Sequence, residues 1–263
     1  MVASGCPEEA LAPTRALAER IDKVALLVED MRHGKAEAIN RIIAEASGDF
    51  LVMLNADAFP LPGSIAKLLE VARDPMVGAV SAMPVFEEKG GLLRHSLSLM
   101  WSAHNSLSLS LNHAGVSNHA CDELILVRRR LVSSLPSNLV NDGAYIGGLV
   151  RSKGYSVKFS TAAKVNIAVP SLLVDLVRQR RRIIYGHVQV WKKLGRPPRT
   201  VESLMFSDPI TSLKTLVKVL AGRPRLVTAL PVVLAGESIS GLLGIVDALR
   251  SSEAHAVWKR NAR

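Results

Sequence analysis

Apolar positions recur with two different spacings along the first 170 residues, and the two spacings alternate. Spacings of three and four residues predict helices over residues 11–20, 35–46, 64–72, 92–112 and 144–150. Short apolar runs predict strands over residues 24–28, 50–54, 77–83, 121–127, 157–159 and 164–168. The run at 50–54 has no polar alternation, which is typical of a strand buried on both faces. Strands that alternate with helices predict an α/β protein.

Beyond Pro170 the pattern predicts helices alone. The first of them is long and carries the basic run from Gln179 to Arg182, and the proline-bearing residues 192–208 predict a basic linker and a domain boundary. Residues 226–246 are apolar apart from Glu237 and approach the length of about 20 residues that spans a bilayer. A central acid costs about 2.5–3.5 kcal/mol on insertion. We therefore predict one membrane-embedded or re-entrant helix within residues 209–263, with a soluble packing helix as the alternative.

Leucine-rich residues 92–112 leave a similar choice open. As a helix they would place apolar residues on one side, which suits either a membrane surface or a protein core.

Polar residues follow the predicted strand 50–54 where it ends. Asn55 and Asp57 stand there, and Pro60 prevents the strand from continuing. Open α/β sheets bind ligands just past the carboxyl ends of their strands. A carboxylate at that place suits a hard divalent cation and a diphosphate. Gly34-Lys35 lies upstream, but the full phosphate-binding pattern G-x-x-x-x-G-K-[ST] is not present.

The composition of the chain favours contact with a membrane and binding of an anionic ligand. Hydrophobic residues make up 48% of the chain and the mean hydropathy is +0.22, which favours contact with a membrane surface. The net charge of +10 suits diphosphates or anionic lipid. No basic patch is interleaved with aromatic residues, so nucleic acid is not an expected partner. Cys6 and Cys121 are too few for a disulfide framework, and residues 1–9 lack a signal-peptide pattern, so a cytosolic face is expected.

Several of these elements occur in the order found in one enzyme family. Gly34-Lys35-Ala36 through Asn40, then Gly48-Asp49, an apolar strand and Asn55-Ala56-Asp57, resemble the family 2 glycosyltransferases, whose usual form is GKxxALN, GD or GE, a strand and D-x-D. The similarity can be followed with gaps over residues 2–186. It implies the GT-A fold, a mostly parallel Rossmann-like sheet flanked by helices, over residues 1–191. The family's first strand is not found, and we favour a truncated start over a fold that has lost a central strand.

The resemblance implies a donor site for a nucleotide-diphospho-sugar. It places Lys35 and Asn40 near the diphosphate and makes Asp57 the ligand of Mg²⁺ or Mn²⁺. A solvated lysine at a helix start remains the alternative for Lys35. Ser4 stands where the family carries an aspartate that contacts the nucleotide base. The donor-binding residues implied in this way are Ser4, Gly34, Lys35, Asn40, Asn55 and Asp57.

The resemblance also implies an acceptor side. Asp142 matches the family's general base, although Asn141-Asp142-Gly143 is also a strong turn signal. Gln179 and Arg182 match the Q-x-x-R-W motif, in which the arginine would neutralise the leaving diphosphate; a basic face beside a membrane is the other interpretation. Ile183 replaces the tryptophan and removes a stacking surface, which favours a single transfer over chain elongation.

The implied activity is an inverting hexosyltransferase (EC 2.4) that acts on a lipid-linked, membrane-linked or polysaccharide acceptor at the cytoplasmic face of a membrane. Two alternatives remain open, and a plain lipid-binding protein is the least favoured third. Asn55, Asn141 and Ile183 depart from the family pattern and suggest a catalytically weakened homologue that only binds a nucleotide sugar or a partner. A sugar nucleotidyltransferase also uses glycine, lysine and aspartate on a similar sheet, but it leaves Asp142 and Arg182 without a purpose.

Overall fold

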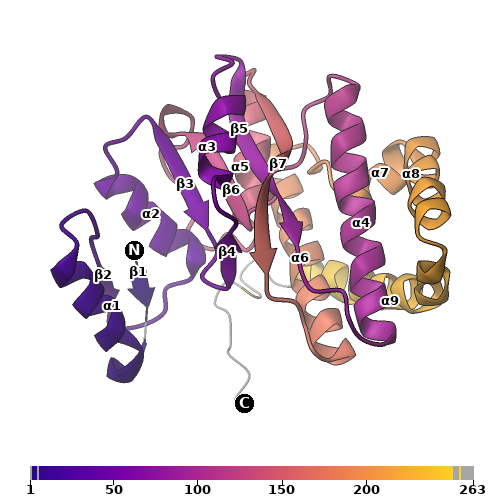
Figure 1. The fold of residues 1–263 in the computed structure, drawn as a ribbon, viewed down its shortest axis with the longest axis horizontal. Coiled ribbons are helices and arrows are strands. Elements are labelled where there is room, and N and C mark those ends of the chain that lie inside the picture. The colour runs from indigo at the N-terminus through magenta and orange to yellow at the C-terminus, as the bar shows by residue number, and fades with distance from the viewer. Residues whose placement is uncertain (1, 5, 251–254, 256–263) are drawn as a thin grey trace.

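A five-stranded sheet forms the centre of the molecule, and helices cover both of its faces (Figure 1). The computed structural model describes residues 2–4, 6–250 and 255. The strand order is β3-β6-β5-β7-β4. The strands are β3 (Phe50–Leu54), β4 (Ala58–Pro60), β5 (Val77–Val85), β6 (Leu124–Arg128) and β7 (Ser156–Ile167).

Alternate residues of the central strands feed two separate cores. Ile125 and Val127 of β6 pack under α2 (Lys35–Glu45), α5 (Asp142–Ser152) and α6 (Leu173–Leu194). Leu124 and Leu126 pack on the other face, under α3 (Ser64–Val71) and part of α4 (Leu92–His113). The short 3-10 turn η1 (Arg129–Leu131) follows β6. The α/β architecture with flanking helices is therefore confirmed.

Strand directions refine the expected mostly parallel sheet. β5 and β7 pair parallel, whereas β6 pairs antiparallel with both β3 and β5, and β4 pairs antiparallel with β7. β3, β5 and β7 consequently run one way, and β6 and β4 run the other. The long β7 also joins residues 157–159 and 164–168, predicted as two paired strands, into one strand that is irregular opposite Ala82 and Met83.

β3 lies at the edge of the sheet, so the prediction that it is buried on both faces is wrong. Val52 and Leu54 are 40% and 45% exposed. A second, two-stranded parallel sheet of β1 (Val2–Ser4) and β2 (Leu27–Glu29) lies nearby with α1 (Glu8–Arg20). Among the described residues β1 and β2 pair only with each other. Helix α2 contacts β1 and also enters the core beside β3, and so connects the two sheets.

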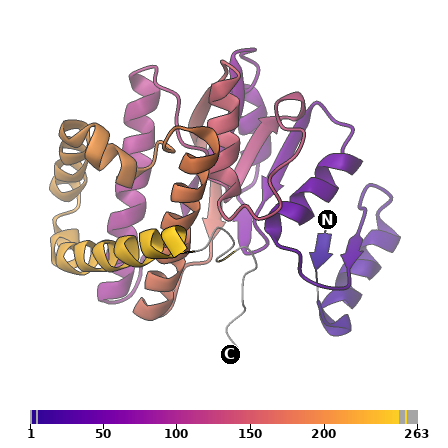
Figure 2. The same ribbon diagram turned by 180° about the vertical axis from the view of Figure 1, so that it is seen from behind.

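The C-terminal helices pack beside α4 and across α6 (Figure 2). They are α7 (Val201–Ser207), α8 (Pro209–Gly222), the 3-10 turn η2 (Pro224–Ala229) and α9 (Leu230–Arg250). Leu99 of α4 is buried in a cluster with Val219 and Leu226, so residues 92–112 form a core helix and not a membrane surface. The predicted linker 192–208 contains the end of α6 and all of α7. A division into residues 1–191 and 209–263 stays a prediction.

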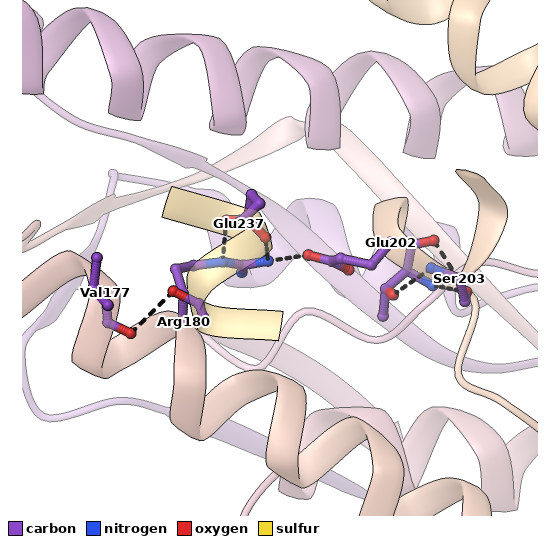
Figure 3. A network of polar contacts seen from close by, with 7 residues as sticks. Val177, Arg180, Glu202, Ser203 and Glu237 are labelled. Atoms are coloured by element: carbon purple, nitrogen blue, oxygen red, sulfur yellow. Dashed lines mark hydrogen bonds and ion pairs between the residues drawn. The ribbon is translucent and has the colours of Figure 1, made fainter. Parts of the chain in front are cut away.

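One guanidinium connects three of these helices (Figure 3). Arg180 of α6 binds Glu237 of α9 through two hydrogen bonds, Nε to Oε1 at 2.7 Å and Nη2 to Oε2 at 2.9 Å. Its Nη2 also donates to Glu202 of α7. Arg181 forms a similar forked pair with Asp247 of α9 at 2.6 and 2.7 Å. Both carboxylates of α9 therefore face the protein.

Candidate active site

The pairing of β3 with β6 brings two distant acidic segments together. Leu54 lies opposite Leu124, so the residues that follow β3 lie beside those that precede β6. The backbone N–H of Asn55 donates to the carbonyl of Glu123 at 3.3 Å, and its side-chain Nδ2 donates to Glu123 Oε2 at 3.0 Å. The edge of the sheet thus carries Asp57, Asp122 and Glu123 in addition to the amide of Asn55.

Two helices begin at this same edge, and each contributes a charged side chain. Lys35 is the first residue of α2, where Gly34 takes a φ of +101° that favours glycine, and Asp142 is the first residue of α5. The Lys35 ammonium lies 2.8 Å from Asn55 Oδ1, 2.8 Å from Asp122 Oδ2 and 3.0 Å from Asp142 Oδ1. An ammonium has three protons to donate, and here each has an oxygen acceptor.

The ionisation of these groups follows from burial and from one shared cation. Burial acts to lower the pKa of Lys35, but Asp122 and Asp142 outweigh it and raise that pKa. Burial would raise the pKa of Asp122, yet Lys35 lowers it to about 2. For Asp142, burial prevails over Lys35 and the pKa is raised. Burial, with Asp122 adding to it, raises the pKa of Glu123 to about 7.

Helix α6 closes the site from the other side. Burial lowers the pKa of Arg182, and the fields of Asp142 and Asp122 oppose that effect, so this guanidinium lies within electrostatic range of the two carboxylates. Helix α6 packs closely against the segment before α5 at Gly186, because a Cβ added to this glycine would lie 2.7 Å from Cβ of Asn141. Gln189 also holds the loop before Asp142. It accepts from the N–H of residue 140 at 2.9 Å and donates to the carbonyl of residue 138 at 2.8 Å.

The structure brings most, but not all, of the predicted residues to this edge. Lys35 contacts both Asn55 and Asp142. Asp57 lies within electrostatic range of Glu123, and Arg182 lies within range of Asp142 and Asp122. Gln179 is half-buried on α6, nearly one turn before Arg182. Gly34 caps α2 at the cluster. Ser4 ends β1, and the prediction for its side chain lies outside what the structure describes.

Asn40 is not brought to this cluster, which corrects its predicted place beside the donor. Its Nδ2 donates to the carbonyl of Leu135 at 2.8 Å, and its Oδ1 accepts from the N–H of Leu135 at 2.7 Å. Both polar ends of the side chain are thus engaged with backbone. Asn40 fastens α2 to the segment after β6, which is a structural role.

Sequence reasoning missed Asp122, Glu123 and Gln189. A strand predicted over residues 121–127 placed both acids inside an apolar run, whereas β6 begins only at Leu124. The two acids therefore precede the strand and stand beside the end of β3. Gln189 gives no signal in the sequence, because its partners are backbone groups about fifty residues away.

The residues predicted to hold a divalent metal would form only part of its coordination shell. Asp57 supplies a single carboxylate, and the amide oxygen of Asn55 already accepts from Lys35. No three His, Cys, Asp or Glu side chains converge as metal ligands within the described residues. Mg²⁺ is usually bound through one or two protein carboxylates together with substrate phosphates and water, so Asp57 would hold it together with a donor diphosphate. The centre of the oxygen cluster is taken by the ammonium of Lys35.

An open depression of about 710 Å³ lies next to the start of α2. Its walls come from the end of β2, from His33 and Glu37 on either side of Gly34-Lys35, and from Ser137. The volume lies within the range of about 300–1,000 Å³ usual for small-molecule sites. The basic and acidic side chains around it make it polar.

An α/β sheet with this acidic edge, a lysine and an arginine defines a GT-A fold of the kind that carries nucleotide-sugar transferases. The sequence model described as glycosyl transferase family 2 matches residues 3–135, and the chain belongs to that family. The predicted family and fold are confirmed.

Curated relatives match part of the chain at low identity. Poly-beta-1,6-N-acetyl-D-glucosamine synthase of Staphylococcus aureus strain COL is 25% identical over 162 residues, 60% of this chain and 39% of that protein. An N-acetylglucosaminyltransferase of Rhizobium meliloti strain 1021 is 25% identical over 188 residues, 66% of this chain and 44% of that protein. The chain therefore spans about two fifths of the length of these relatives.

A solved structure supports the fold over nearly the whole chain. The mannosyltransferase PcManGT from Pyrobaculum calidifontis, in complex with GDP-Man and Mn²⁺, superposes with a TM-score of 0.62 at 21% identity. The match covers 94% of this chain and 76% of that protein. At this identity the likeness concerns the fold.

Proposed function

We propose that this chain transfers a sugar from a nucleotide-diphospho-sugar to an acceptor hydroxyl, with inversion at the anomeric carbon. The observation that carries the proposal is the contact of Asp142 with Lys35 at the acidic edge of the sheet. Arg182 lies within electrostatic range of Asp142, and Asp57 lies within range of Glu123. Membership of glycosyl transferase family 2 supports the same reaction class. Substrates and partners of the relatives are not transferred beyond this class, since the chain spans only part of their length.

Asp142 is the proposed general base. Burial raises the pKa of its carboxyl, which brings the group closer to the pH at which it exchanges a proton with a hydroxyl. The acceptor hydroxyl would give its proton to Asp142 as its oxygen attacks the sugar. Arg182, on the opposite side, would stabilise the negative charge that develops on the departing diphosphate. Direct displacement between the two groups inverts the anomeric carbon.

The donor's nucleoside is proposed to occupy the depression beside α2. His33 and Glu37 in its wall flank Gly34 and Lys35 in the sequence, so a ligand there is proposed to extend its diphosphate toward the carboxylate cluster. Asp57 and Ser4 remain proposed donor contacts. The predicted dependence on Mg²⁺ or Mn²⁺ stays a proposal: Asp57 would bind the cation together with the donor diphosphate, and no step above depends on it.

Donor turnover tests the proposal. Purified chain is incubated with UDP-N-acetylglucosamine, UDP-glucose or GDP-mannose, and released nucleoside diphosphate is measured with and without a glycan or polyprenyl-phosphate acceptor. Asp142→Asn should lower the rate of transfer by about 10²- to 10⁴-fold, the usual contribution of a general base, while donor binding is kept. Nucleotide-sugar binding without any turnover by the wild type would instead support the weakened homologue. Activity with a sugar phosphate and a nucleoside triphosphate would support the nucleotidyltransferase.

A membrane is the proposed location of the acceptor. Among the described residues, Pro224–Arg250 is the one helical stretch long and apolar enough to cross a bilayer. Its carboxylates, Glu237 and Asp247, face inward to arginines, while its outward side is apolar. The large hydrophobic residues exposed on α9 are Leu234, Ile239, Leu242, Ile245 and Leu249, and Ser238 and Arg250 are exposed beside them. A helix with its charges inside and its apolar side outside suits a lipid surface.

Basic residues on α8, which packs against the start of α9, suggest that the lipid surface is anionic. Lys214 and Lys218 are exposed on α8 next to Leu213 and Val217, which are 62% and 57% exposed. Cys6 and Cys121 are not joined in a disulfide, which suits a reducing compartment, so the cytoplasmic face is proposed.

Sedimentation with vesicles of phosphatidylcholine, with and without phosphatidylglycerol, tests the location. Leu242→Glu on α9 should reduce binding, whereas Leu69→Glu on α3, an equally large change at another exposed leucine, should not. Equal binding by both variants would contradict the lipid face.

A further inference from the structure

Lys35 is surrounded by oxygen atoms in the way a bound cation would be. Three oxygens from three separate segments lie 2.8–3.0 Å from its nitrogen: an amide oxygen after β3, a carboxylate before β6 and a carboxylate at the start of α5. Asp142 is 4% exposed and has little access to solvent cations. The segments are 20 to 107 positions from Lys35 in the sequence, so the whole fold builds this arrangement.

These oxygens are chemically a hard-cation donor set. Carboxylate and amide oxygens are the ligands that Mg²⁺, Mn²⁺ and Ca²⁺ prefer. In this chain the cation among them is an ammonium that belongs to the protein. It holds the negative charges of Asp122 and Asp142 together, which would otherwise repel each other in a buried place.

We infer that Lys35 is the resident cation of the proposed donor site, and that a divalent cation can take Asn55 Oδ1, Asp122 Oδ2 and Asp142 Oδ1 only after the ammonium has left them. The inference deepens the proposed function by naming what neutralises the site before a donor arrives. Its test measures metal binding and not sugar transfer, so either conclusion can fail without the other.

Competition between two cations for one set of oxygens makes a clear prediction. Lys35→Met removes the ammonium and leaves all three oxygens. Mn²⁺ alone, without donor, is titrated into the wild type and the variant, and binding is followed by calorimetry and by the loss of the free Mn²⁺ paramagnetic signal. We expect the variant to bind one Mn²⁺ about 5- to 150-fold more tightly than the wild type, the usual range of coupling between two ligands.

Matched variants separate this effect from a general change of charge. Lys67→Met removes an exposed lysine of α3 and should leave the Mn²⁺ affinity as in the wild type. Lys35→Met combined with Asp122→Asn removes one of the oxygen anions and should lose the gained affinity. A wild type that binds one Mn²⁺ as tightly as Lys35→Met would overturn the inference, and so would a variant with no gain.

Melting temperatures, measured with and without Mn²⁺, test the inference if Lys35→Met folds poorly. Without the ammonium, the buried carboxylate of Asp142 and the half-buried carboxylate of Asp122 lose the cation between them, so a lower melting temperature is expected. Mn²⁺ should raise that temperature more in the variant than in the wild type. Lys35→Gln, whose amide still donates one hydrogen bond, is the second variant and should show the same gain. If neither folds at any Mn²⁺ concentration, the wild type decides alone: tight binding contradicts the inference, and no saturable binding supports it.

Discussion

Arg180 and Lys35 each lie between two carboxylates, but the side chain of Arg180 is much less exposed to solvent than that of Lys35. Arg180 joins α6, α7 and α9, and its side chain is 15% exposed. Its planar guanidinium makes two parallel bonds to Glu237 and another to Glu202 (Figure 3). Lys35 joins α2, β6 and α5, and its side chain is 39% exposed. Its ammonium is a point charge on a flexible stem and imposes no planar geometry.

The balance of charge differs as well. At the Arg180 junction, burial acts to raise the pKa of Glu202, but Arg180 outweighs it and holds that pKa well below its ordinary value. At the Lys35 cluster one ammonium serves Asp122 and Asp142 with Glu123 adjacent, and the pKa values of Asp142 and Glu123 are raised. Both carboxylates beside Arg180 are thus paired with its guanidinium, whereas Lys35 shares one positive charge among more carboxylates than it can neutralise. Acids with strongly shifted pKa values are typical of functional sites but also occur in structural ion pairs. We therefore interpret the Arg180 contacts as structural and the Lys35 contacts as part of the proposed active site.

Arg180→Met gives the largest effect expected from this comparison. It leaves the half-buried carboxylates of Glu202 and Glu237 without their cation. Removal of one partner from a fully buried pair costs about 3–5 kcal/mol, so a loss of up to that size is expected. Urea unfolding followed by circular dichroism should show that loss in the free energy of unfolding. The triple variant Arg180→Met, Glu202→Gln, Glu237→Gln should recover most of it, because no uncompensated charge remains. Equal stability of the single variant and the wild type would show that the junction is not the closed ion pair described here.

The pH dependence of stability should distinguish the two clusters. The pKa of Glu123 is about 7 in the folded protein and about 4.5 as its ordinary value, so the folded state binds the extra proton between these pH values. The free energy of unfolding should therefore fall as pH rises through this window, by up to about 3 kcal/mol at 1.36 kcal/mol per unit of pKa. Glu123→Gln should remove that fall, so that the variant matches the wild type near pH 4.5 and exceeds it at pH 8.

Glu202 provides the control for this measurement. Its pKa lies below the ordinary value, so its contribution to stability is fully present above about pH 4.5 and is lost only in stronger acid. The stability of Glu202→Gln should consequently lie below that of the wild type by a constant amount between pH 4.5 and pH 7. Both series are measured in chelator-containing buffer. A wild type whose stability is flat over this window would show that Glu123 ionises normally.

The sequence predicts where helices and strands begin and end better than it predicts which elements pack beside each other. β3 was predicted with its observed bounds and α2 to within one residue, because hydrophobic spacing is a local property. The burial of β3 was not predictable, since Val52 and Leu54 are exposed through the place of the strand in the sheet. Residues 157–159 and 164–168 form one strand because β5 supplies a continuous partner, which hydrophobicity along the chain does not reveal.

The site divides along the same line. Lys35, Asp57 and Asp142 were found because each belongs to a short local motif. Asp122 and Glu123 were missed because only the pairing of β6 with β3 brings them to the site. The hydrogen bond from Asn55 to Glu123 joins residues 68 positions apart in the sequence. Asn40 was misplaced for the converse reason: it lies five residues after Lys35 on the same helix, but its side chain faces Leu135.

Gln189→Ala is the smallest of these effects and tests whether the Lys35 cluster depends on its surroundings. The amide binds the N–H of residue 140 and the carbonyl of residue 138, and alanine leaves these backbone groups without their partner at a cost of about 1–3 kcal/mol. Because that loop leads into Asp142, the rate of transfer should fall while the affinity for nucleoside diphosphate stays unchanged. Gln189→Glu keeps the acceptor for residue 140 but loses the donor for residue 138, and should fall in between. The Arg180 junction lies outside this loop, so a nearly additive loss of stability in Arg180→Met with Gln189→Ala is expected; strong coupling would instead join the two clusters into one network.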